Sequence, residues 1–270
     1  MNTIYYCFPG GAFKVLTMSY DDGTIADRRL ISIFNKYGIK GTFHINGGLL
    51  GQVAARTRIP VEEMHDLYQG HEISCHTYTH PTIARCPLPM VADQVLEDRK
   101  VLEEIAGYPV RGLSYPNGSF SDDIVTMLPA LGIEYSRTVV STNSFAIPED
   151  FLRWPATCHH NGNLMELGKK FIALDKKQYL YMMYVWGHSY EFDNDNNWDL
   201  MENFCEMVSG NENIWYATNI EIVDYMNALK ALRFTADGSI VHNPSASPVW
   251  PSINNDKIVK VEGGETKKLY

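Results

Sequence analysis

The 270-residue sequence has no excess of basic residues and no long apolar run. It carries 23 Lys and Arg residues against 32 Asp and Glu residues, which gives a formal net charge of −9. A partner bound through nucleic-acid phosphates would require clustered cations, so the composition argues against nucleic acid. The longest apolar run, residues 179–186, is far shorter than the roughly 20 residues of a membrane-spanning helix. We therefore expect neither a nucleic-acid partner nor a membrane span.

Paired cysteine motifs and a signal peptide are also missing from the sequence. The five cysteines are scattered and form no CxxC pair, which argues against a zinc ribbon and favours buried free thiols. The first six residues contain neither a basic region nor a long apolar run. The chain as given is therefore expected to be cytoplasmic, although a leader removed before residue 1 would change that expectation. The oligomeric state is left open.

Apolar strand-like runs alternate with amphipathic helical segments, which predicts a parallel α/β fold. Strands are expected at residues 15–19, 41–45, 71–75, 112–115, 133–139, 153–157 and 179–186. Helices are expected at residues 25–37, 61–68, 91–106, 121–131, 198–208 and 220–232. About seven strands alternating with helices are typical of a barrel, in which catalytic residues collect at the C-terminal ends of the strands.

After residue 232 the alternation of strand and helix patterns stops. The Asp237-Gly238 pair predicts a tight hairpin, and residues 243–251 are too rich in Pro and Ser to form a helix. Residues 257–262 are extended in pattern. We therefore predict a barrel domain over residues 1–232 and a small β appendage over residues 233–270 that packs on the barrel.

Residues suited to metal chemistry follow two of the expected strands. Asp21 and Asp22 end the first strand, although a turn aspartate that caps the next helix would explain such a pair equally well. His76 and His80 follow the third strand, and two imidazoles four residues apart can bind one metal. With one carboxylate from Asp22 they would form a site that leaves positions open for water and substrate.

Three further strand ends carry polar residues. His188 follows the seventh strand, where the alternative is a packed, hydrogen-bonded histidine. Tyr115 and Asn117 follow the fourth strand, on either side of a proline that has no N–H to donate. Arg137 lies on the fifth strand, where a surface ion pair is the competing explanation.

In these motifs the chain resembles carbohydrate esterase family 4, the polysaccharide deacetylases, over about residues 14–230. The first family motif stands here as Ser19-Tyr20-Asp21-Asp22-Gly23, and the second stands complete as His76-Thr77-Tyr78-Thr79-His80. The histidine of the fifth motif matches His188. The resemblance implies a distorted (β/α) barrel of about seven strands.

The resemblance also implies roles for these residues. Asp22, His76 and His80 would be metal ligands. Asp21 would be the general base, and His188 the general acid. A backbone N–H from Tyr115 or Asn117 would help to stabilise the oxyanion.

The sequence differs from the family in the third motif. Ser114 falls near the usual arginine and Asn117 at the usual tyrosine, so the charge that would tune Asp21 is missing from its usual place. We hypothesise that Arg137 replaces it. Arg111 is the second candidate, but it precedes the fourth strand and is expected at the far end of the barrel.

Trp154 and the pair His159-His160 are further candidates near the site. Trp154 is predicted to contact substrate, since residues 153–155 resemble the region of the fourth family motif, although most tryptophans serve only packing. The neighbours His159 and His160 are expected to be a loop feature near the mouth of the site, because adjacent histidines cannot easily share one metal.

The sequence therefore predicts a metal-dependent hydrolase that removes acetyl groups from N-acetylated sugars. An O-acetyl ester, or a small cyclic amide, is an alternative substrate. A catalytically silent carbohydrate-binding protein is the alternative of another class. Two imidazoles and a carboxylate suit one divalent ion, zinc first, but cobalt, nickel, manganese or iron are also possible.

Overall fold

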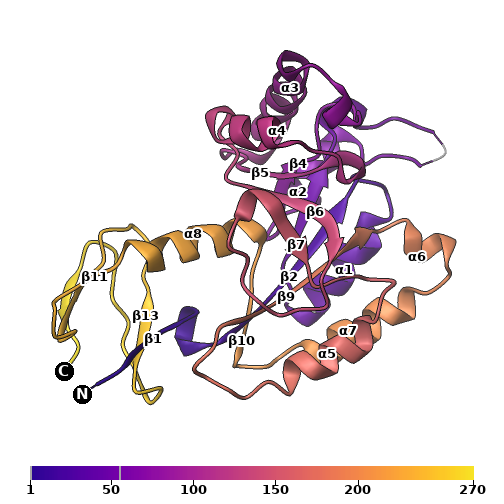
Figure 1. Ribbon diagram of the computed structural model, residues 1–270. Helices are drawn as coiled ribbons and strands as arrows, with labels where there is room; N and C mark the ends of the chain where they lie inside the picture. Colours follow the sequence, from indigo (N-terminus) through magenta and orange to yellow (C-terminus); the bar gives the residue numbers. More distant parts are fainter. Residues whose placement is uncertain (1, 55) are drawn as a thin grey trace.

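The computed structural model describes residues 2–54 and 56–270. Eight parallel strands form the central sheet of the larger body in Figure 1. They are β2 (Lys14–Asp21), β3 (Gly41–Ile45), β4 (Glu72–Cys75), β5 (Gly112–Ser114), β6 (Tyr135–Ser141), β7 (Trp154–Ala156), β8 (Cys158–His159) and β9 (Tyr181–His188). A ninth short strand, β10 (Ile214–Tyr216), pairs with the start of β2.

The sheet closes on itself through residues 154–159. The strand order is β7-β6-β5-β4-β3-β2-β9-β8, so β7 pairs with β6 while β8 pairs with β9. Only Thr157 separates β7 from β8, and its N–H donates to the Tyr184 carbonyl at 2.8 Å. One extended segment therefore bridges the two ends of the sheet. The predicted distorted barrel of about seven parallel strands is confirmed.

Helices cover the outside of the barrel (Figure 1). They are α1 (Asp27–Tyr37), α2 (Val61–Leu67), α3 (Leu88–Ala106), α4 (Asp122–Met127), α5 (Leu164–Ile172), α6 (Glu191–Asn194), α7 (Trp198–Val208) and α8 (Asn219–Ala231). Gly38 ends α1 with a φ of 65°, a left-handed conformation that glycine adopts without strain. No helix among the described residues combines the length and the apolar character needed to cross a membrane.

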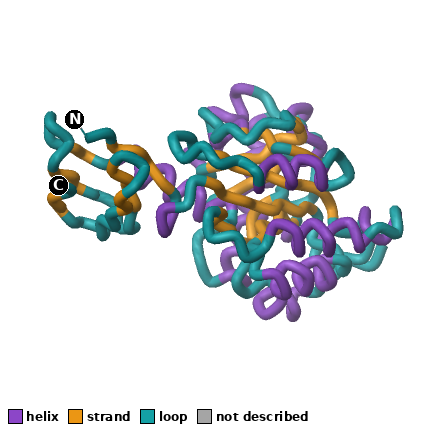
Figure 2. Tube along the Cα trace, turned by 90° about the horizontal axis from the view of Figure 1, so that it is seen from below, coloured by secondary structure: helices purple, strands orange, loops and turns teal. Residues whose placement is uncertain are grey.

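Short antiparallel strands form the appendage, which lies beside the barrel in Figure 2. They are β1 (Ile4–Cys7), β11 (Arg233–Phe234), β12 (Ile240–His242), β13 (Trp250–Ile253), β14 (Lys257–Ile258) and β15 (Thr266–Lys268). The predicted Asp237-Gly238 hairpin joins β11 to β12. β1 pairs with β13 in this body, although the sequence analysis had grouped residues 4–7 with the barrel. The pairing satisfies backbone groups that a lone N-terminal strand would expose to solvent.

The strands of the barrel interior are buried on both faces. All eight residues of β2 are buried, as expected for a parallel strand enclosed by neighbours and helices. Trp154 of β7 is fully buried against the rings of Tyr135, Phe151 and Tyr184, each with its plane about perpendicular to the indole. This aromatic cluster fills the barrel where residues 154–159 close it.

Replacing Trp154 with alanine should lower the free energy of unfolding by about 3–5 kcal/mol, because a fully buried indole leaves a cavity. Urea unfolding followed by circular dichroism measures this. The exposed Tyr179 is the control, and Tyr179→Ala should change stability by no more than about 0.5 kcal/mol. Equal small effects of the two substitutions would contradict the role given to Trp154.

Candidate active site

The predicted site residues meet at the C-terminal ends of the barrel strands. Asp21 is the last residue of β2, and it lies in register with His188, the last residue of β9. On its other side Asp21 is in register with His44 of β3. Residues separated by more than 160 positions in the chain therefore surround one carboxylate, as the closed barrel requires.

Asp21 is buried, and cationic and polar groups compensate for that burial. The Arg137 guanidinium donates to Oδ2 of Asp21, and the Ser114 hydroxyl donates to Oδ1 at 3.1 Å. Arg137 is itself fully buried and lies 4.4 Å from the centre of the Trp186 ring. Burial alone would raise the pKa of Asp21, but Arg137 and the neighbouring histidines hold it well below its usual range. The carboxylate is therefore charged.

Asp22 faces a different set of groups. Its backbone has a φ of 84°, and its N–H donates to the His44 carbonyl at 2.9 Å. A nitrogen of Arg58 lies 3.2 Å from Oδ1, and a nitrogen of Arg56 lies 3.9 Å from Oδ2. Oδ1 is buried and accepts no hydrogen bond from the described residues. Asp22 thus presents a buried carboxylate oxygen with lone pairs to spare.

The two histidines of the second motif lie beside this oxygen. The rings of His76 and His80 have centres 4.7 Å apart, and Nε2 of His80 is 3.9 Å from Oδ1 of Asp22. One donor atom from each of Asp22, His76 and His80 lies within 4.8 Å of the others. The side-chain amide of Asn46 donates to the His76 and Thr77 carbonyls, at 2.6 and 2.8 Å, and so holds the turn before His80. These three side chains could hold one cation.

Ser114 sets the proton position on His76. Its hydroxyl hydrogen is given to Asp21, so its oxygen accepts from Nδ1 of His76 at 2.6 Å. The Ser114 carbonyl lies 2.9 Å from the same nitrogen. Burial lowers the pKa of His76 to about 4, so the ring is neutral and Nε2 keeps a lone pair. A neutral imidazole with its proton on the nitrogen that faces away from the ion, here Nδ1, is the form that binds metals.

His188 has a carboxylate partner that the sequence analysis missed. Oε1 of Glu191 lies 3.2 Å from Nδ1 of His188, and Oε2 accepts the His188 backbone N–H at 3.1 Å. Burial would lower the pKa of His188, but Glu191 and Asp21 raise it above its ordinary value. An acid three residues beyond a strand-end histidine is the signal that could have identified Glu191 from the sequence.

Two predicted substrate contacts are corrected. Trp154 is fully buried in the barrel closure, so it has no surface to offer a substrate. The Tyr115 N–H is already bonded to the Arg137 carbonyl at 3.0 Å within the sheet, so it cannot serve an oxyanion. Asn117 is exposed with a φ of 56°, and no acceptor for its N–H is found among the described residues. Of the two donors predicted, the Asn117 N–H is the one available.

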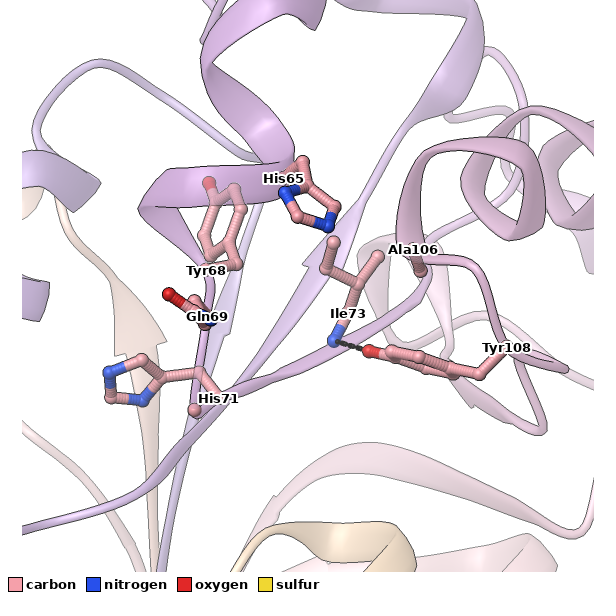
Figure 3. A pocket seen from close by; sticks show the side chains of 8 residues that line it. His65, Tyr68, Gln69, His71, Ile73, Ala106 and Tyr108 are labelled. Atoms are coloured by element: carbon pink, nitrogen blue, oxygen red, sulfur yellow. Dashed lines mark hydrogen bonds between the residues drawn. The ribbon is translucent and has the colours of Figure 1, made fainter.

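A separate pocket lies at the other end of the barrel, between the end of α2 and the start of β4 (Figure 3). His65 and His71 line it, and the Tyr108 hydroxyl accepts the Ile73 N–H at 2.9 Å. None of the predicted site residues lines this pocket. It is therefore not part of the candidate active site.

Comparison with known proteins agrees with the motifs. Residues 9–136 match the family model described as polysaccharide deacetylase. The chain is 29% identical over 119 residues to a chitooligosaccharide deacetylase from Sinorhizobium fredii, which covers 43% of this chain and 53% of that protein. It is 26% identical over 121 residues to a peptidoglycan-N-acetylglucosamine deacetylase from Bacillus cereus, which covers 44% and 42%. The chain thus spans about half, or less, of the length of these relatives.

The fold has solved counterparts. A crystal structure of a protein from Mycobacterium smegmatis assigned to the polysaccharide deacetylases aligns with a TM-score of 0.64 at 15% identity. The alignment covers 83% of this chain and 93% of that one, so it extends well beyond the segment matched by the family model. The resemblance predicted from the motifs is confirmed: residues 9–136 match the polysaccharide deacetylase model, and the chain shares its fold with this solved structure.

Proposed function

We propose that the chain is a metal-dependent hydrolase that removes acetyl groups from N-acetylated sugars. The observation that carries the proposal is the separation of two adjacent carboxylates. Asp21 is held by Arg137, whereas Asp22 lies with two histidine donors. The names of the relatives, deacetylases of chitooligosaccharide and of peptidoglycan N-acetylglucosamine, support this substrate class. The activity is assigned to the barrel, whose strands begin with β2 at Lys14.

Asp22, His76 and His80 would hold the divalent ion. Two imidazole nitrogens and one carboxylate suit zinc, while cobalt, nickel, manganese or iron also accept this set. Oδ1 of Asp22 is buried without a hydrogen bond from the described residues, and a cation would satisfy it. When bound, such an ion lowers the pKa of a water to roughly 7 and polarises the acetyl carbonyl.

The remaining groups divide the proton transfers. Asp21 is kept ionised by Arg137, so it can accept a proton from the attacking water. His188 of β9 is the register partner of Asp21 of β2, and its raised pKa keeps a proton available for the leaving amine. The Asn117 N–H, which has no acceptor among the described residues, would donate to the developing oxyanion. Base and acid thus come from neighbouring strands, β2 and β9.

Acetate release from chitooligosaccharides tests the function. We expect release with zinc, loss of release with a chelator, and recovery when zinc is restored. Acetylated xylan and a small cyclic amide serve as the competing substrates. Acetate from xylan alone would identify an O-acetyl esterase, and no hydrolysis of any substrate by the zinc-loaded protein would favour a silent binding protein.

The aspartate pair offers a matched control for this assay. Asp21→Asn should abolish acetate release while zinc stays bound, because the amide is no base. Asp22→Asn should release the zinc held with His76 and His80, because the amide is a weaker ligand. The reverse pattern would show that the two roles have been exchanged.

Ser114→Ala should weaken zinc binding by about 10-fold, since the hydroxyl that accepts from Nδ1 of His76 is removed while the backbone carbonyl of residue 114 remains. Competition with a fluorescent zinc chelator measures the affinity. Ser136→Ala removes a buried hydroxyl from the neighbouring strand β6 and should leave the affinity unchanged. Wild-type affinity in Ser114→Ala would show that the hydroxyl contributes nothing to holding the His76 ring beyond the carbonyl of residue 114.

Arg137→Gln should move the acidic limb of the kcat/KM profile to a pH about 1–3 units higher, because Asp21 loses the cation that lowers its pKa. Removing one partner of a buried ion pair also destabilises a protein, so the profile is recorded below the Tm of the variant. Arg153→Gln, a change at an exposed arginine, is the control. An unchanged limb in Arg137→Gln would rule out Arg137 as the residue that tunes Asp21.

A further inference from the structure

Three potential metal ligands meet next to His188, apart from the site already described. His159 ends β8, His160 follows it, and Glu191 begins α6. Oε2 of Glu191 lies 3.1 Å from Nε2 of His159 and 3.3 Å from Nε2 of His160. One donor atom from each of the three residues lies within 4.8 Å of the others. From the sequence, His159 and His160 are expected to be only a loop feature.

The end of β8 explains why adjacent histidines converge. Neighbours on a strand point to opposite faces, but β8 stops at His159 and the chain turns there, with the Gly162 N–H bonded to the His159 carbonyl at 2.8 Å. The two imidazole rings lie with centres 4.5 Å apart and planes 38° apart. The turn therefore brings both rings to one side.

His160 is the strongest indication of a ligand. The residue is fully buried, and neither ring nitrogen has a hydrogen-bond partner among the described residues. Its ring stacks on Phe192 and on Tyr20, with centres 4.2 and 5.7 Å away. A Cβ on Gly187 would lie 2.0 Å from its Nδ1, so the glycine provides the space for this ring. A buried polar ring is thus held 3.3 Å from the Glu191 carboxylate without a hydrogen bond, which is costly unless something binds it.

The charges at this cluster suit a cation. Burial lowers the pKa of His160 to about 3, so its ring is neutral and carries a lone pair. Burial would raise the pKa of Glu191, but hydrogen bonds with His159 and His188 hold it well below its usual range. The side chains of His159 and Glu191 are 24% and 23% exposed, which leaves a route from solvent. Two imidazoles and one carboxylate select ions of the zinc class over magnesium or calcium, which prefer oxygen ligands.

A purely hydrogen-bonding role for Glu191 explains less. It accounts for His188 and His159 but leaves the nitrogens of His160 unsatisfied. Metal binding through Nε2 of His159 would place the ring proton on Nδ1. Nδ1 would then lose only one contact, the long 3.2 Å hydrogen bond that it accepts from the backbone N–H of Asn161. That amide lies at the surface, where water can replace the contact.

We propose that His159, His160 and Glu191 form a second divalent-metal site of the zinc class, separate from Asp22, His76 and His80. The proposal stands independently of the deacetylase function. Glu191, a ligand of the second ion, would also remain hydrogen-bonded to His188, the proposed general acid beside the first site.

Zinc stoichiometry tests the proposal. Untagged protein is stripped with chelator, equilibrated by dialysis against micromolar zinc, and analysed by inductively coupled plasma mass spectrometry. We expect two ions per wild-type chain and one in Asp22→Ala. We also expect one ion in His159→Ala, and two in the control His65→Ala, which removes an exposed histidine.

The outcomes separate the two sites. One ion in the wild type with none in Asp22→Ala would overturn the second site and leave the first intact. One ion in the wild type that persists in Asp22→Ala but is lost in His159→Ala would support the second site and overturn the first. Glu191→Gln keeps the side-chain shape, and it should lose one ion if His159→Ala fails to fold.

Discussion

Two adjacent carboxylates can both stay charged in a buried place only if each has its own cationic or donor groups. The end of β2 meets this constraint by pointing Asp21 and Asp22 to different neighbours. Asp21 lies against Arg137 and Ser114, and the left-handed backbone at Asp22 directs the second carboxylate toward the histidines. A non-glycine residue at a φ of 84° is strained, and such strain is found where function requires a particular side-chain direction. The proposed base and the proposed ligand are therefore kept apart by backbone geometry.

Barrel closure supplies these groups from distant parts of the chain. Residues 154–159 bridge β6 and β9, which places Arg137 and His188 on either side of the same interior. Trp154 packs the closure from within, and His159 and His160 emerge from its end beside Glu191. One segment thus contributes to the stability of the barrel and to the second cluster of metal donors. The shared contact of Glu191 with His188 connects that cluster to the proposed acid.

The periodic elements were predictable from the sequence, and the irregular ones were not. The strand at residues 41–45 and the helix at residues 198–208 match β3 and α7, because long apolar patterns fix both period and face. α5 was missed although Leu164, Leu167 and Phe171 have helical spacing, and β8 and β10 are too short to carry a pattern. The hypothesis of an arginine replacement placed Arg137 beside Asp21 correctly, because parallel strand ends meet at one edge. Trp154 was misassigned, since motif position does not reveal on which side of a barrel wall a side chain lies.

The division of roles between the two aspartates is open to direct observation. A crystal grown with zinc, with anomalous diffraction recorded at the zinc edge, would locate the ion. We predict a peak about 2.0–2.2 Å from donor atoms of Asp22, His76 and His80, with Asp21 still bonded to Arg137. A peak ligated by Asp21, or a fully loaded crystal without a peak at Asp22, would contradict this account.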